Sequence, residues 1–81
     1  MTKDDIRICF LEELVKIAPD IDPGTVPPDA HLQDDLGLDS MDILNLVTAL
    51  HARLGIDIPE RSYPEIATPD RAVDWIARAL G

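Results

Sequence analysis

The sequence predicts an all-α protein, an antiparallel four-helix bundle with a long first loop and a short third helix. Three long segments repeat apolar residues at helical spacing, and helix start and stop signals flank them. No segment alternates apolar and polar residues as a half-buried strand does. The 81 residues, 46% of them hydrophobic, suffice for one modest core. We therefore expect one domain over residues 1–81.

The first helix is expected from Lys3 to Ala18. Thr2 can cap its start, Asp5 stands where a capping box needs an acid, and Pro19 disfavours helix in the residue before it. The predicted buried face comprises Ile6, Cys9, Phe10, Leu14 and Ile17, widened by Ile8, Leu11 and Val15. The residues predicted to be solvated are Glu12, Glu13 and Lys16.

A long connection follows, from Pro19 to Leu38, and it contains four prolines. A loop of this length in a small domain needs anchors in the core. The expected anchors are Ile21, Val26, Leu32, Leu36 and Leu38. A short turn is expected near Asp29 to Gln33.

The second helix is predicted to begin at Ser40, with Asp39 as its N-cap and Gly37 relieving the turn before it. Asp42 adds negative charge to the first turn, and Gly55 provides the stop. The apolar residues form two stripes. One can face the core and comprises Ile43, Leu46, Val47, Leu50 and Leu54. The opposite stripe, Met41, Leu44 and Thr48, forms an exposed apolar strip beside an exposed serine, which suggests a docking surface.

Two shorter elements complete the chain. A third element is expected between Pro59 and Ala67, interrupted by Pro64 and anchored by Tyr63 and Ile66. The last helix should start at Thr68-Pro69-Asp70. Its predicted buried face comprises Val73, Ile76, Ala77 and Leu80, with Trp75 at the edge.

The charge pattern limits the partners. The net charge is −9, which opposes binding to nucleic acid or anionic membranes. Seven acidic residues and no Lys or Arg lie between Ile17 and Ala52, around Ser40. Acidic loops also keep small proteins soluble, but their coincidence with the serine and the apolar strip favours a partner with a basic surface.

The sequence indicates a soluble, cytoplasmic monomer. Cys9 is the only cysteine, so no intrachain disulfide can form, and a free thiol is compatible with a reducing compartment. The N-terminus has no basic segment followed by an apolar run, and no stretch is long enough to span a bilayer.

We find no pattern that predicts catalysis. His31 and His51 have no neighbours that suggest a triad, and two histidines with one cysteine make a zinc site improbable. Asp35, Asp39 and Asp42 fit recognition acids better than a general acid and base. Two other classes remain open: an unmodified interaction module that binds a partner helix through Met41 and Leu44, and a small hydrolase or transferase.

One segment resembles the modification site of acyl carrier proteins: Asp35-Leu36-Gly37-Leu38-Asp39-Ser40-Met41-Asp42, followed by an amphipathic helix and Gly55-Ile56-Asp57-Ile58-Pro59-Glu60. The resemblance extends from Ile6 to Leu80. It implies that Ser40 receives 4'-phosphopantetheine from coenzyme A through a phosphopantetheinyl transferase. The arm's thiol would then carry an acyl or aminoacyl group as a thioester. An anionic phosphate suits the start of a helix, where unpaired N–H groups and the dipole favour it.

The same resemblance implies roles for the neighbouring residues. Basic patches of the loading and transfer enzymes would meet Asp35, Asp39 and Asp42, while Met41, Leu44 and Thr48 would form the apolar contact. The acyl chain would insert between helices near Leu46, Leu50 and Ile58.

The second helix departs from the fatty-acid type of carrier, which usually has glutamates along this outer face. Asn45 stands near its middle, and His51 and Arg53 stand toward its end. The departure favours a specialised member with a dedicated partner, such as a lipid, polyketide or aminoacyl-loading system.

Overall fold

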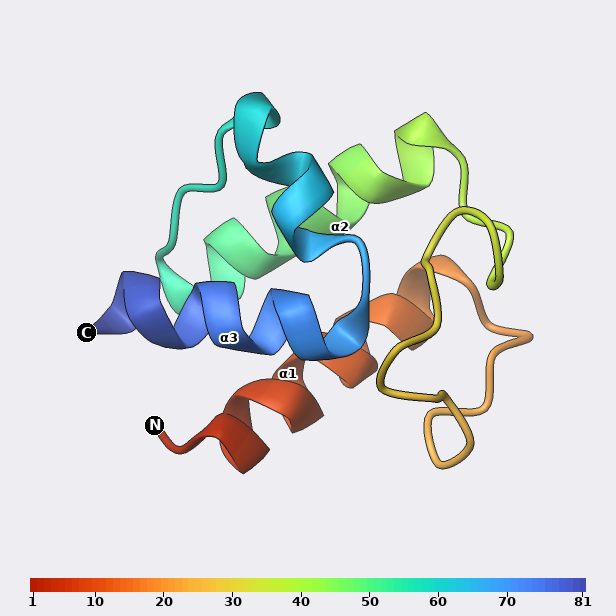
Figure 1. Cartoon of the computed structure of the whole chain (residues 1–81), viewed down its shortest axis with the longest axis horizontal. Helices are drawn as coiled ribbons and strands as arrows, with labels where there is room; N and C mark the ends of the chain where they lie inside the picture. The colour runs from red at the N-terminus through yellow and green to blue at the C-terminus, as the bar shows by residue number, and fades with distance from the viewer.

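Four helices follow the order that the sequence predicts. The computed structural model describes residues 1–81 and contains α1 (Lys3–Ile17), α2 (Ser40–Leu54), the 3-10 helix η1 (Glu60–Ile66) and α3 (Pro69–Leu80). Figure 1 shows α1 running opposite to α2 and α3, with the long first loop at the end of the bundle where α1 stops and α2 starts. The predicted all-α fold is confirmed.

Local capping explains where the helices begin and end. Thr2 Oγ1 accepts from the N–H of Asp5 at 3.1 Å, and Asp5 Oδ2 accepts from the N–H of Thr2 at 3.3 Å. This is the predicted capping box of α1. At the end of α2, Gly55 adopts a left-handed conformation with φ of 69°, which a residue with a side chain rarely takes. Thr68 caps α3, with Pro69 at its first position.

The core is one cluster of 15 buried residues to which every helix contributes. Phe10, Leu14, Leu46, Leu50 and Ile76 have no exposed surface. Leu32 and Leu38 anchor the long loop in this cluster, as predicted, while Ile21 and Leu36 pack against its edge. Val26 is half-buried.

Two residues predicted to be buried are exposed. Ile8 keeps 57% of its surface and Leu80 keeps 42%. Ile8 lies on the side of α1 opposite the stripe that contains Ile6 and Phe10, so no element covers it. Leu80 is the final residue of the last helix, beyond Ile76, where the core ends.

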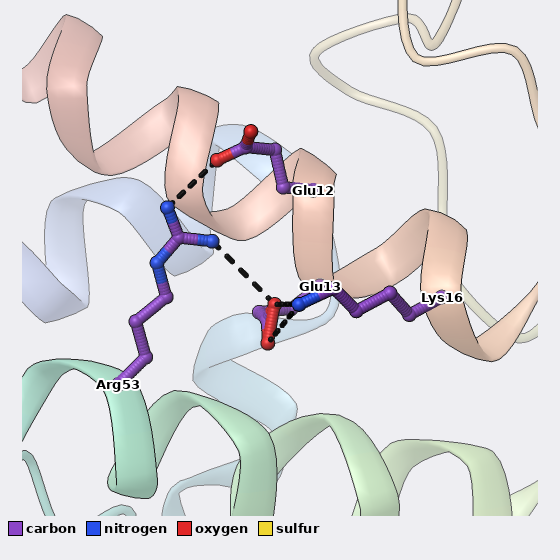
Figure 2. A network of polar contacts seen from close by, with 4 residues as sticks. All are labelled: Glu12, Glu13, Lys16 and Arg53. Atoms are coloured by element: carbon purple, nitrogen blue, oxygen red, sulfur yellow. Dashed lines mark hydrogen bonds and ion pairs between the residues drawn. The ribbon is translucent and has the colours of Figure 1, made fainter.

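The prediction that Glu13 is solvated is wrong, because it stands in the middle of the buried stripe of α1. Its carboxylate is paired instead with Lys16 Nζ at 2.9 Å and Arg53 Nη1 at 3.5 Å. Arg53 Nη2 also binds Glu12 Oε1 at 2.7 Å. Figure 2 shows Arg53 reaching from α2 to both glutamates of α1. We call Glu12, Glu13, Lys16 and Arg53 the α1–α2 ion cluster.

The α1–α2 ion cluster also determines whether Arg53 is a free cation on the surface of α2. Its hydrogen bond to Glu12 raises the pKa of Arg53, against a smaller lowering from burial. Its charge is therefore compensated by α1, and Arg53 is not a free cation on the outer surface of α2.

The segment after α2 corrects one local expectation. Pro64 does not interrupt the third element, because η1 continues through it. A short 3-10 helix makes few backbone hydrogen bonds, so the missing proline N–H costs little. The expected turn near Asp29 to Gln33 is present as two turns, at residues 28–29 and 32–36. Two backbone hydrogen bonds tie the long loop to the junction of η1 and α3: Leu32 N to Ala67 O at 2.8 Å and Asp70 N to Pro28 O at 2.9 Å.

Candidate functional site

Ser40 is the first residue of α2 and is exposed to solvent. Asp39 Oδ1 accepts from the N–H of Asp42 at 2.8 Å, and Asp42 Oδ2 accepts from the N–H of Asp39 at 3.2 Å. The two aspartates therefore form the capping box, and the Ser40 hydroxyl takes no part in it. The other serine, Ser62, is buried. Of the two serines, only Ser40 presents an accessible hydroxyl at the start of a helix.

The loop before Ser40 has a defined conformation. Asp35 Oδ2 accepts from the N–H of His31 at 2.7 Å, and His31 Nδ1 accepts from the N–H of Gln33 and of Asp34 at 3.2 and 3.1 Å. Gly37 follows with φ of 77°, which turns the chain into α2. Asp35 thus has a structural role that its place in the motif did not predict.

The strip predicted on the outer face of α2 is exposed. Met41 keeps 62% of its surface and Leu44 keeps 45%. Thr48 is exposed as well, and its hydroxyl donates to the carbonyl of Leu44 at 2.9 Å. Because this bond satisfies the hydroxyl within the helix, Thr48 can offer its methyl group to the strip.

A pocket of about 640 Å³ opens between this end of α2 and the segment that follows Pro59. Ser40, Met41, Ile43 and Leu44 line it on the α2 side. The other walls comprise His31, Leu32 and Gln33 from the loop, Glu60, Tyr63, Pro64 and Ile66 from η1, then Ala67 and Arg71. A volume of this size falls within the range of small-molecule sites. The site is therefore a serine at the edge of a largely apolar pocket.

The end of the molecule that contains Ser40 has the negative charge that the sequence predicts. None of the seven acidic residues between Ile17 and Ala52 pairs with a lysine or arginine, so their negative field is not neutralised locally. Asp35 and Asp39 are exposed, and Asp42 is half-buried. The end of the molecule that contains Ser40 can attract a basic surface.

The three residues predicted to contact an acyl chain lie away from the pocket lining. Leu46 and Leu50 have no exposed surface, and Ile58 keeps 4%. All three belong to the closed core. Their contact with a cargo stays a prediction.

Sequence reasoning missed the far wall of the pocket. Tyr63 was expected only as an anchor, and Glu60 and Arg71 were given no role, yet all three line the same space as Ser40. No local pattern marks these residues, because the packing of η1 and α3 opposite α2 brings them there.

No three His, Cys, Asp or Glu side chains form a group that could hold a metal ion. None of the helices combines the length and apolarity that a bilayer span requires.

The residues at Ser40 fit a covalently attached phosphate ester. A hydroxyl free of capping bonds can accept the group, and the start of a 15-residue helix favours the negative charge. The pocket beside the hydroxyl has room for a flexible arm. Fold and site together define a class: small helical domains with one exposed serine at the start of a helix.

Comparison with known proteins specifies the family. Residues 9–76 match the model described as "Phosphopantetheine attachment site". The chain is 44% identical to "Acyl carrier protein 2, mitochondrial" of Arabidopsis thaliana over 83 aligned residues, covering 91% of this chain and 66% of the relative. It is 38% identical to "Acyl carrier protein, mitochondrial" of Neurospora crassa over 55 residues, covering 68% of this chain and 41% of the relative. The chain belongs to the acyl carrier protein family, whose cofactor is a covalently attached 4'-phosphopantetheine.

These relatives also correct one expectation. The sequence indicated a cytoplasmic protein, whereas both relatives are named as mitochondrial. The prediction of a cytoplasmic location is therefore contradicted. Its basis was a free cysteine, the lack of a basic segment followed by an apolar run, and the lack of a membrane span, and these features do not distinguish one reducing compartment from another. The chain spans about two thirds or less of the length of these relatives.

Proposed function

We propose that this chain carries acyl groups as thioesters on a 4'-phosphopantetheine arm attached to Ser40, and presents them to partner enzymes. One observation supports the proposal most directly: the hydroxyl of Ser40, at the start of α2, is exposed and makes no capping hydrogen bond. The protein itself performs no catalysis in this scheme. The cofactor supplies the reactive thiol, while the fold holds the attachment point in solvent.

The modification needs a separate transferase and coenzyme A. The oxygen of Ser40 forms a bond to the phosphorus that bears the pantetheine, and the bond from that phosphorus to the bridging oxygen breaks. Adenosine 3',5'-bisphosphate leaves with that oxygen, and the serine proton passes to a base of the transferase. This chain contributes an accessible hydroxyl and a helix start that tolerates the new charge.

Partner enzymes would recognise the same end of the molecule. Asp35, Asp39 and Asp42 would attract basic docking patches, and the Met41, Leu44 and Thr48 strip would form the apolar centre of the contact. None of these acids pairs with a lysine or arginine, which supports this assignment. The departure at Asn45 still favours a dedicated partner, but Arg53 no longer does, because α1 compensates its charge.

The names of both relatives support an acyl rather than an aminoacyl cargo, and a mitochondrial setting. We propose that a cargo chain enters through the pocket beside Ile43 and extends toward Leu46, Leu50 and Ile58. Leu46 and Leu50 follow Ile43 on one face of α2, at successive turns. Entry deeper than the pocket requires these core side chains to separate.

The test is modification of the purified protein by coenzyme A and a broad-specificity phosphopantetheinyl transferase, followed by intact mass measurement. The expected result is the gain of one phosphopantetheine per chain. An unchanged mass, under conditions that modify a control carrier, would contradict the carrier function.

The second candidate is an unmodified interaction module. The exposure of Met41 and Leu44 favours it, because adjacent apolar side chains in solvent often mark a binding surface. This candidate predicts that partner binding survives without any modification of Ser40.

A further inference from the structure

Arg71 lies across the pocket from Ser40. It occupies the first turn of α3, whereas Ser40 begins α2, and both line the same 640 Å³ space. The side chains of α2 and α3 meet in the core through Leu46, Leu50, Val73 and Ile76, and the pocket lies at the first turns of the two helices. A flexible group attached at Ser40 can enter this pocket.

The acids beside Arg71 on α3 are held by other cations. Asp70, the preceding residue, pairs with Arg7 of α1. Asp74, which stands three residues later and could pair with Arg71 along the helix, binds Lys3 of α1 at 3.0 Å. Arg71 itself makes no ion pair and no side-chain hydrogen bond. The contacts between α1 and α3 thus leave this guanidinium available.

Arg71 is also the only lysine or arginine on the pocket wall. The other ionisable groups there are Glu60, Tyr63 and His31. The remaining lining is mostly apolar, with Ile43, Leu44 and Ile66 among its members. The pocket thus combines an apolar wall with one available cation, which suits a short chain that bears an anionic group.

We propose that Arg71 binds an oxyanion of the group carried on Ser40. This inference rests on the proposed carrier function. A guanidinium recognises phosphate and carboxylate through the same pair of parallel hydrogen bonds. The oxyanion therefore has two sources: the phosphodiester of the arm, or a terminal carboxylate of a dicarboxylic acyl cargo.

The experiment follows the Arg71 Nε–Hε signal by NMR in four forms of the whole chain: unmodified, phosphopantetheinylated, butyryl-loaded and succinyl-loaded. Butyryl and succinyl have the same four-carbon chain and differ only in a terminal methyl or carboxylate. Both loaded forms are made from the corresponding acyl coenzyme A with the transferase, and intact mass verifies each form. The spectrum of Arg71→Gln identifies the signal by its loss.

The outcomes separate the two sources. A shift of the Arg71 signal on phosphopantetheinylation, unchanged by cargo, assigns the oxyanion to the phosphodiester. A shift specific to the succinyl form assigns it to the carboxylate. An identical signal in all four forms, with intact mass verifying the modification, would overturn the inference and leave the carrier function standing. A mass that never increases would refute the carrier function itself.

A second measurement uses a matched pair of variants. Arg78 lies two turns further along α3 and does not line the pocket of Ser40; it lines a neighbouring hollow that Arg71 also borders. If the cargo carboxylate is bound, succinyl should raise the Tm relative to butyryl in the wild type and in Arg78→Gln, and this difference should vanish in Arg71→Gln. If the phosphodiester is bound, the rise in Tm on phosphopantetheinylation should vanish in Arg71→Gln alone. Equal behaviour of the two variants in both comparisons would count against a binding role for Arg71.

Discussion

The two sides of α2 differ in how they are held. Its inner side packs on α1 through Leu46 and Leu50, and its final turn is linked to α1 by the α1–α2 ion cluster. Its outer side and first turn face solvent and the pocket, and no backbone of α3 or η1 approaches closely. The inner side therefore fixes the position of the helix, while the outer side is left available for an attached group and for partners.

The largest contrast concerns modification. Ser40→Ala should abolish phosphopantetheine transfer, because the acceptor oxygen is gone. Ser62→Ala, at the only other serine, should leave transfer intact because Ser62 is buried. Intact mass after a fixed reaction time measures both variants. Modification of Ser40→Ala, or its loss in a folded Ser62→Ala protein, would reverse the assignment of the two sites.

The two sides of α2 should also differ in their contribution to stability, and here the inner side should have the larger effect. Leu50→Ala should lower the free energy of unfolding by about 2–5 kcal/mol, because Leu50 is fully buried and a cavity would remain. Leu44→Ala should cost less than about 1 kcal/mol, because Leu44 is already 45% exposed. Urea denaturation of both variants provides the comparison. Losses of similar size would mean that the two sides of α2 do not differ as described.

Asp39 allows the structural and electrostatic roles of the first turn to be separated. Asp39→Ala removes the acceptor of the Asp42 N–H and should cost about 1 kcal/mol of stability. Asp39→Asn keeps a capping oxygen and should cost far less, while removing the negative charge. If partners recognise this acid, the asparagine variant should bind them more weakly at low salt despite its stability. Unimpaired binding by the asparagine variant would assign Asp39 a capping role alone.

The ion cluster should give the smallest effect, because Arg53 keeps about a third of its side chain exposed and salt screens such pairs. Arg53→Gln should lower the Tm modestly at low salt and less at high salt. The raised pKa of Arg53 means that its contribution is fully present below the ordinary arginine value and is lost only as the pH rises through the raised value. Its effect should therefore be constant across neutral pH. Arg78→Gln, which breaks no ion pair, is the control, and an equal salt dependence in that variant would contradict this account.

The sequence predicts features that are set by residues close together in the chain. It does not predict features that depend on the packing of residues far apart in the chain. Asp39, Ser40 and Asp42 form a local helix start, and the structure has it at the predicted residue. Glu13 was predicted to be solvated because it is charged, but its partner Arg53 stands 40 residues away. The far wall of the pocket was missed for the same reason, since Arg71 meets the space beside Ser40 only in the folded chain.

The difference between the two sides of α2 is tested most directly by comparing amide chemical shifts, residue by residue, in the unmodified and phosphopantetheinylated wild type. The account predicts that the changes concentrate at Ser40 and around the pocket, at residues such as His31, Leu44 and Tyr63. The α1–α2 ion cluster, on the other side of α2, should remain unchanged. Changes centred on Glu12 and Arg53, with none at Ser40, would contradict it.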